Sequence, residues 1–122
     1  IGMHELSVTE NILNIVIDAA QKNGARRITA IHLVIGELSS IVDDSVQFYF
    51  DLISKGTLAE NAVLHFRRES AVVVCLDCAQ QFHARVPLEP RCSACGSARV
   101  QVRGGREFFI ESIEVEDEDS HR

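Results

Sequence analysis

Apolar residues recur at three- and four-residue spacing near the start of the chain. The stripe consists of Val8, Ile12, Ile15, Val16 and Ala19. Such spacing is typical of an amphipathic helix. Ser7-Val8-Thr9-Glu10 fits a capping box, in which serine and glutamate satisfy two free amides, and Lys22-Asn23-Gly24 supplies a late cation and a glycine stop. We therefore predict a helix over residues 8–23.

Three later segments carry a strand pattern, and one carries a second helix pattern. Residues 27–35 are rich in β-branched side chains and have little polar face, which predicts a central strand. Residues 62–69 and 106–116 alternate apolar and polar positions and predict two further strands. Apolar residues between 46 and 53 fit a second helix that ends near Gly56.

Residues 70–105 differ in composition from the segments on either side. They hold all four cysteines and both prolines but few large apolar residues, so we interpret them as a small inserted module. The predicted fold is α+β, with two helices packed on a three-stranded sheet built by residues 1–69 and 106–122. The acidic end from Glu114 to Arg122 is expected to be solvated and frayed.

The cysteines form two CxxC pairs, Cys75-Leu76-Asp77-Cys78 and Cys92-Ser93-Ala94-Cys95, with thirteen residues between them. This spacing lets both sulfurs of a pair reach one tetrahedral ion and favours zinc, which would make residues 70–105 a zinc-ribbon module. Four thiolate ligands leave no position for water or substrate, so the zinc would be structural. Disulfides, a redox CxxC and a rubredoxin-like iron site are the alternatives. His83 lies between the pairs and is left out of the ligand set.

Composition narrows the classes of function. The chain has 122 residues, is 46% hydrophobic and has a net charge of −6, which argues against a protein that binds nucleic-acid phosphates. The module is nevertheless locally basic, which keeps a nucleic-acid-binding ribbon as a disfavoured alternative. Its arginines are Arg85, Arg91, Arg99, Arg103 and Arg106. Since no stretch reaches the ~18 apolar residues of a membrane span, we expect no membrane association and a cytoplasmic protein.

The amino terminus carries a second candidate metal site. Met3 is the only methionine, and we interpret Ile1-Gly2 as residues left by recombinant expression, which would make His4 the second residue. A terminal amine, the following histidine amide and its imidazole can chelate one ion, and a square-planar nitrogen set favours nickel(II) or copper(II). The alternative is a frayed terminus with a chance histidine. His32 and His65 fall within predicted strands and are interpreted as packing or edge residues.

No serine, histidine and aspartate set, phosphate-binding glycine loop or acid and base pair is recognisable, so we do not expect an enzyme. Taken together, "MHELSV" before a helix, "LVIGELSSI", "FYFDLISKGT" and the paired CxxC motifs resemble the HypA/HybF family of hydrogenase maturation nickel metallochaperones. The resemblance covers essentially the whole chain in order.

The resemblance implies a nickel-binding domain of two helices on a three-stranded sheet together with a zinc ribbon. It implies nickel(II) as cargo on the Met3 amine, the His4 amide and imidazole and the Glu5 amide, and structural zinc on Cys75, Cys78, Cys92 and Cys95. An acidic residue before the second helix is a further ligand in some members, and Asp43 and Asp44 lie nearby. The implied partners are a maturation GTPase and the large-subunit precursor of a nickel-iron hydrogenase. A zinc-ribbon adaptor without nickel is the alternative function.

Overall fold

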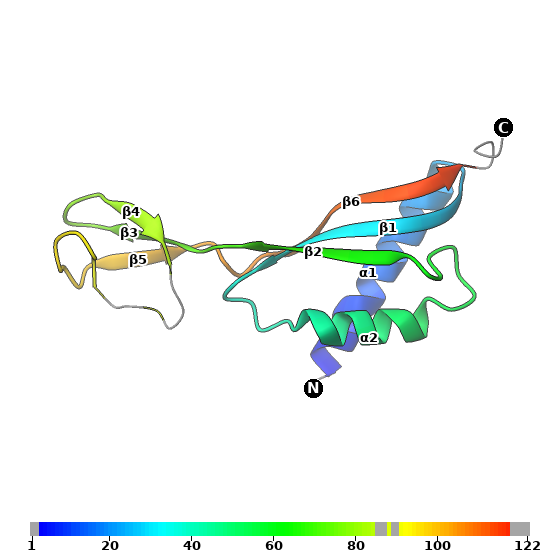
Figure 1. Cartoon of the computed structure of the whole chain (residues 1–122), viewed down its shortest axis with the longest axis horizontal. Coiled ribbons are helices and arrows are strands. Elements are labelled where there is room, and N and C mark those ends of the chain that lie inside the picture. The colour runs from blue at the N-terminus through cyan, green and yellow to red at the C-terminus, as the bar shows by residue number, and fades with distance from the viewer. Residues whose placement is uncertain (1–2, 85–87, 89–90, 118–122) are drawn as a thin grey trace. The chain divides into compact units, whose positions relative to one another are not determined.

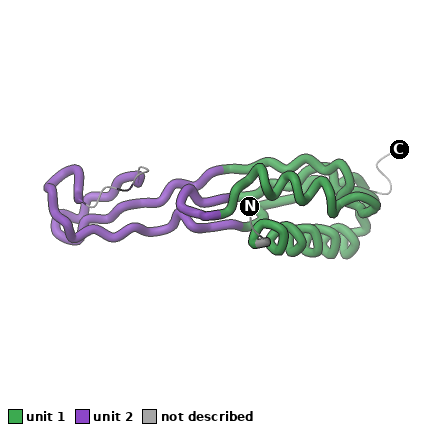
Figure 2. The backbone as a smooth tube through the Cα atoms, turned by 90° about the horizontal axis from the view of Figure 1, so that it is seen from below, with its two compact units in different colours: residues 1–34, 41–67, 109–122 green, residues 35–40, 68–108 purple. Residues whose placement is uncertain are grey.

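The computed structural model describes residues 3–84, 88 and 91–117 (Figure 1). Backbone contacts divide the chain into two compact units (Figure 2). The first unit comprises residues 1–34, 41–67 and 109–122, and the second comprises residues 35–40 and 68–108. Among the helices described here, none is long and apolar enough to cross a lipid bilayer.

The first unit contains two helices and a three-stranded sheet. The elements are α1 (Met3–Lys22), β1 (Ala25–Gly36), α2 (Asp43–Ile53), β2 (Val63–Glu69) and β6 (Phe108–Asp117). The strand order β2-β1-β6 makes β1 central, and both helices lie alongside this sheet in Figure 1. The α+β class and the pairing of two helices with a three-stranded sheet are thus confirmed.

The core of the first unit lies between α1, α2 and β1. Its fully buried side chains are Val16, Ile28, Ile31, Leu33, Val46 and Phe50. On β2, Leu64 is 7% exposed whereas its neighbour Val63 is 53% exposed, as expected for a sheet covered on one face and open on the other. On β2 the open face includes the exposed residues Val63, His65 and Arg67, and this face is considered further below.

The predicted start of the first helix is wrong. Residues 3–7 belong to α1, so Ser7 is an exposed residue inside the helix rather than its cap. The buried Thr9 hydroxyl donates to the Glu5 carbonyl one turn earlier, an interaction made within a helix. Ile15, predicted on the buried stripe, is 57% exposed, because the buried face follows Thr9, Ile12 and Val16.

The acidic end also differs from its prediction. Glu114 to Asp117 belong to β6 instead of a frayed tail, and residues 118–122 lie outside the described part of the chain. Arg26 donates to Glu116, while Arg27 Nη2 lies 3.5 Å from the other Glu116 oxygen. Basic partners on the neighbouring strand β1 therefore keep the acidic residues of β6 ordered.

The second unit has its own three-stranded sheet, which the sequence did not predict. Its strands are β3 (Val72–Cys75), β4 (Gln81–His83) and β5 (Val100–Arg103), in the order β4-β3-β5. Both pairings are antiparallel, and Val73 lies opposite Phe82 on one side and Val102 on the other. Strands of three or four residues give too short an alternation to be recognised among polar residues and cysteines.

Two glycines allow a close backbone approach inside the second unit. Leu38 N donates to Gly105 O over 2.6 Å, and Gly36 N donates to Glu107 O over 2.7 Å. A Cβ on Gly36 would lie 2.1 Å from the Gly105 oxygen, so no larger residue fits there. Gly105 has φ of 84°, a conformation that glycine adopts readily and other residues avoid.

We predict that Glu116→Gln lowers the free energy of unfolding at pH 7. The Arg26 hydrogen bond lowers the pKa of Glu116, so the carboxylate stabilises the fold at pH values above its unfolded-state pKa of about 4.3. This contribution disappears as the pH falls through the lowered pKa. Denaturant unfolding at pH 7 and at about pH 2.5 should show the parent and variant differing only at the higher pH. Glu10→Gln, at an exposed position on α1, is the control for loss of one negative charge. An equal decrease in the free energy of unfolding in Glu10→Gln would contradict a specific role for the Glu116 carboxylate.

Candidate metal centre

The two CxxC pairs lie in two turns of the second unit that have the same hydrogen-bond pattern. The Asp77 and Cys78 amides each donate to Cys75 Sγ over 3.4 Å. In the second turn, the Ala94 and Cys95 amides donate to Cys92 Sγ over 3.3 and 3.4 Å. Amides directed at a sulfur favour its thiolate form, which is the form that binds a metal ion.

The equivalence of the two turns extends to the residue after each pair. Ala79 N donates to Cys75 O over 3.0 Å, and Gly96 N donates to Cys92 O over 2.9 Å. Ala79 has φ of 66° and Gly96 has φ of 76°, so both adopt the left-handed conformation. This conformation is costly for alanine and readily accessible to glycine.

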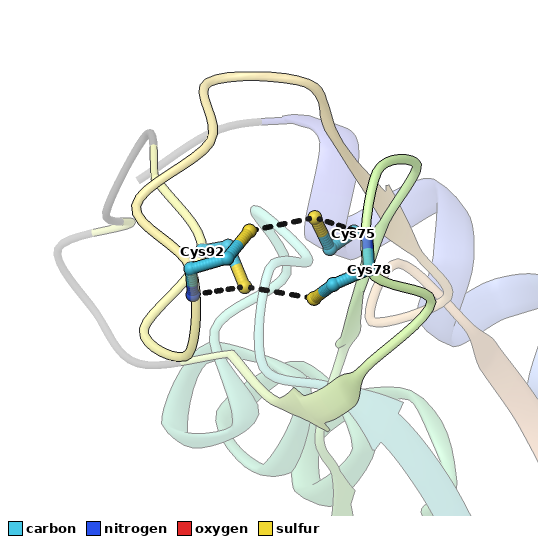
Figure 3. A group of neighbouring side chains, drawn as sticks. Cys75, Cys78 and Cys92 are labelled. Carbon is cyan, nitrogen blue, oxygen red and sulfur yellow. Dashed lines mark hydrogen bonds between the residues drawn. The ribbon is translucent and has the colours of Figure 1, made fainter.

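The four sulfur atoms converge on one point (Figure 3). All four lie within 4.8 Å of one another, and two distances, Cys75 Sγ to Cys95 Sγ and Cys78 Sγ to Cys92 Sγ, are 3.6 Å. Thiolates around a tetrahedral zinc ion with Zn–S bonds of about 2.3 Å would be about 3.8 Å apart. A disulfide bond would require about 2.05 Å, and all four cysteines are free thiols. The donor set and its spacing are therefore compatible with a zinc site.

The cysteines divide into two with lowered pKa values and two with raised pKa values. The Cys78 amide is the main cause that lowers the pKa of Cys75 to about 6, and the Cys95 amide likewise lowers the pKa of Cys92. The Ser97 amide acts to lower the pKa of Cys95, but the neighbouring thiols and burial outweigh it and raise that pKa to about 12. The first cysteine of each pair thus loses its proton more readily, and an ion would displace the proton of the second.

Polar contacts connect the two turns beyond the sulfur atoms. Ser97 and Arg99 both donate to the Asp77 carboxylate, and the Leu76 amide donates to the Arg99 carbonyl over 2.8 Å. Asp77 lies between the cysteines of the first pair, so these bonds fix the first turn against the segment that follows the second pair. This arrangement holds the two pairs of sulfur atoms facing each other.

Most of the arginines that make the second unit locally basic donate hydrogen bonds within it. Arg91 donates to Gly96 O over 3.2 Å, and Arg99 pairs with Asp77. Arg103 donates to the Gln101 side chain and Arg106 to the Leu38 carbonyl. Arg85 lies outside the described residues. These contacts weaken the argument for a phosphate-binding patch, which needs side chains free to reach an anion.

The amino-terminal candidate residues lie in the first turn of α1. Met3 is the first helical residue, His4 is exposed, and the Glu5 side chain is only 5% exposed. Glu5 Oε2 accepts a hydrogen bond from the Val42 amide over 3.3 Å at the start of α2, whose cap residue makes no side-chain capping bond. The Glu5 carboxylate therefore binds the amide of the α2 cap residue, as the glutamate of a capping box does, a role that the sequence did not predict.

This contact also determines what lies beside the amino terminus. It brings the first turn of α1 next to the first turn of α2, which contains Asp43 and Asp44. The three residues named from the sequence thus share the first turn of α1, where His4 is exposed and Glu5 is buried, and the first turn of α2 places two carboxylates nearby.

Comparison with known proteins identifies the family of the chain. Residues 3–115 match the family model described as "Hydrogenase/urease nickel incorporation, metallochaperone, hypA". The hydrogenase maturation factor HypA of Dehalococcoides mccartyi is 44% identical over 120 residues, covering 95% of this chain and 97% of that protein. The corresponding protein of Caldanaerobacter subterraneus subsp. tengcongensis is 41% identical over 115 residues, covering 93% and 100%.

Solved structures of HypA proteins also resemble this chain. The solution structure of the nickel metallochaperone HypA from Helicobacter pylori superposes with a TM-score of 0.65 at 26% identity, covering 93% of this chain and 98% of that one. A second HypA solution structure gives a TM-score of 0.69 at 27% identity, covering 93% and 97%. The fold and site thus belong to a class of metal-carrying proteins rather than enzymes. The chain is a member of the HypA family of hydrogenase maturation nickel metallochaperones.

We predict that the two equivalent turns respond in opposite ways to exchange of their left-handed residues. Gly96→Ala should destabilise the second unit by about 1 kcal/mol, because alanine is strained at that φ although its Cβ would meet nothing within 4 Å. Ala79→Gly should leave stability unchanged or raise it by up to about 1 kcal/mol, because it removes the same strain. Thermal unfolding of the metal-loaded chain, followed by the amide signals of residues 72–103, measures both. A stabilising Gly96→Ala would contradict the prediction.

Proposed function

We propose that this protein captures nickel(II) at its amino terminus and delivers it, in the cytoplasm, to the large-subunit precursor of a nickel-iron hydrogenase together with a maturation GTPase. Membership of a nickel-incorporation family supports the cargo. The single observation that carries the location of the site is the exposed His4 side chain in the first turn of α1.

The proposed nickel ligands are the Met3 nitrogen, the His4 amide and imidazole, and the Glu5 amide. An all-nitrogen set of this kind suits nickel(II) in a square-planar arrangement. His4 is exposed, which allows the rapid ligand exchange that a carrier needs. The Glu5 side chain is already engaged with α2, so only its backbone is assigned to nickel.

The proposed role of Cys75, Cys78, Cys92 and Cys95 is to hold one zinc ion. The ion would cross-link β3 to the second turn and so replace the apolar core that a unit of this size cannot build. Because all four donors are cysteines, the ion would have no open position for a substrate. The zinc would therefore keep the second unit folded as a surface for partner proteins.

We predict that His4→Ala lowers nickel affinity by more than about a hundredfold and leaves zinc content unchanged, because it removes a ligand and not only a supporting contact. Isothermal titration with Ni²⁺ and metal analysis by mass spectrometry measure the two quantities. Titrating a chain that begins at Met3 against the chain that carries Ile1-Gly2 tests the amine, since a peptide amide at Met3 should bind more weakly.

Glu5→Gln is the matched variant for this titration. It retains the backbone amide and a side-chain oxygen for Val42, so nickel affinity should stay within a few-fold of the parent. Full retention of tight nickel binding in His4→Ala would contradict the assignment of His4. If Glu5→Gln lowers nickel affinity as much as His4→Ala does, the proposal that only the backbone of Glu5 binds nickel is wrong.

We predict that the purified reduced chain retains one zinc ion and that Cys92→Ser loses it. Without the ion, the amide signals of residues 72–103 should collapse to unfolded positions, while those of α1, α2 and β1 stay dispersed, because the first unit has an apolar core of its own. Ser93→Ala, in the same turn, should retain zinc and serves as the control. Iron in place of zinc, or a folded second unit after chelation, would contradict the prediction.

A further inference from the structure

Three chemically reactive side chains form a row across the open face of the first unit's sheet. His65 comes from β2, His32 from the central strand β1, and Glu114 from β6. The imidazole rings of His32 and His65 stack with a centroid separation of 4.7 Å and an interplanar angle of 13°. On the other side, His32 Nε2 lies 2.6 Å from Glu114 Oε2. All three belong to the first unit, and none belongs to the sites described above.

The chemistry of this row is that of a metal site. Two imidazoles and a carboxylate are the donors that divalent nickel, zinc, copper and iron accept, whereas magnesium and calcium prefer sites built from oxygen. Neighbouring positions on adjacent strands hold side chains at the spacing that lets two donors share one ion. We propose that His32, His65 and Glu114 form a second, weaker site for a divalent transition-metal ion on the open face of the sheet.

The spacing of His32 and Glu114 supports this proposal. Two ligands at about 2.1 Å from one ion and at right angles to each other are about 3.0 Å apart. The present separation of 2.6 Å therefore needs to open by only a few tenths of an ångström to admit the ion. His65 is exposed, so its ring can rotate to direct a nitrogen at the same point. Water would complete the coordination, because the side chains of His32 and Glu114 are 33% and 61% exposed.

The partners of the neighbouring carboxylates distinguish Glu114 from them. Glu116 is paired with Arg26 and Arg27, and Glu111 lies 2.8 Å from Arg67 Nη2. An arginine beside a carboxylate supplies the positive charge that a metal ion would bring and competes with it. Glu114 instead lies within hydrogen-bond distance of a histidine, a residue type that itself binds metal ions.

The arrangement also indicates the strength of the site. Among the described residues, only the cysteine cluster has three or more ligand atoms within 4.8 Å of one another. The row on the sheet must therefore rearrange on binding, and its affinity should be lower than that of the cysteine cluster.

The test uses the full zinc-loaded chain carrying His4→Ala, so that the amino-terminal site is removed and the outcome does not depend on the proposed carrier function. Ni²⁺ is titrated at pH 7.5 while the imidazole proton signals are followed by NMR. Nickel held by two imidazoles, one carboxylate and water is high-spin, so the His32 and His65 signals should broaden together and saturate at one ion. Mg²⁺ should leave both signals unchanged.

Variants identify the ligands. His65→Phe retains a ring that can stack on His32, and Glu114→Gln retains a hydrogen-bond acceptor, so both should fold as the parent does. Each should weaken nickel binding at least about tenfold and remove the nickel-dependent rise in melting temperature. His83→Ala, on β4 of the second unit, should bind as the parent does. Unchanged affinity in His65→Phe and Glu114→Gln, loss in His83→Ala, or no saturable binding in the parent would overturn the proposal.

Discussion

The burial of β1 is the interaction on which the first unit depends. Ile28, Ile31 and Leu33 are removed from water between the neighbouring strands and the two helices. Each such side chain contributes roughly 1.5–3 kcal/mol relative to an exposed position, so the strand fixes where α1 and α2 pack. His32 is partly exposed on this mostly buried strand, where it meets His65 of β2 and Glu114 of β6. The central strand thus also supplies the central member of the row on the open face.

The second unit is not stabilised mainly by an apolar core, as the first unit is. Its strands β3, β4 and β5 contain three or four residues each, and Val73 and Cys75 are the only buried residues of these three strands. A core this thin cannot offset the conformational entropy of ordering the segment. The two equivalent turns, with their paired amides on sulfur and the bridge through Asp77, arrange four thiols so that one ion can supply the missing stability. An ion bound by the four cysteines would therefore supply stability that the small apolar core of this unit cannot provide.

Much of this organisation was predictable from the sequence because it rests on local pattern. The β-branched run around Ile31 indicated the central strand, and the two CxxC spacings indicated the cysteine cluster. What could not be predicted depends on partners distant in sequence. Glu5 accepts a hydrogen bond from Val42, thirty-seven residues away, and α1 begins already at Met3. The pairing of His32 with Glu114 spans eighty-two residues and likewise leaves no local signature.

Because α1 begins at Met3, the backbone nitrogens assigned to nickel are also the first nitrogens of a helix. In a helix the N–H bonds run parallel to the axis, whereas chelation requires the nitrogens to converge on one ion. Binding of nickel at the proposed site would therefore require this turn to unwind. By thermodynamic reciprocity, a partner that holds the turn helical would weaken nickel binding by the same factor by which nickel would weaken binding of that partner. Docking against α1 would then favour release of the ion without a competing ligand.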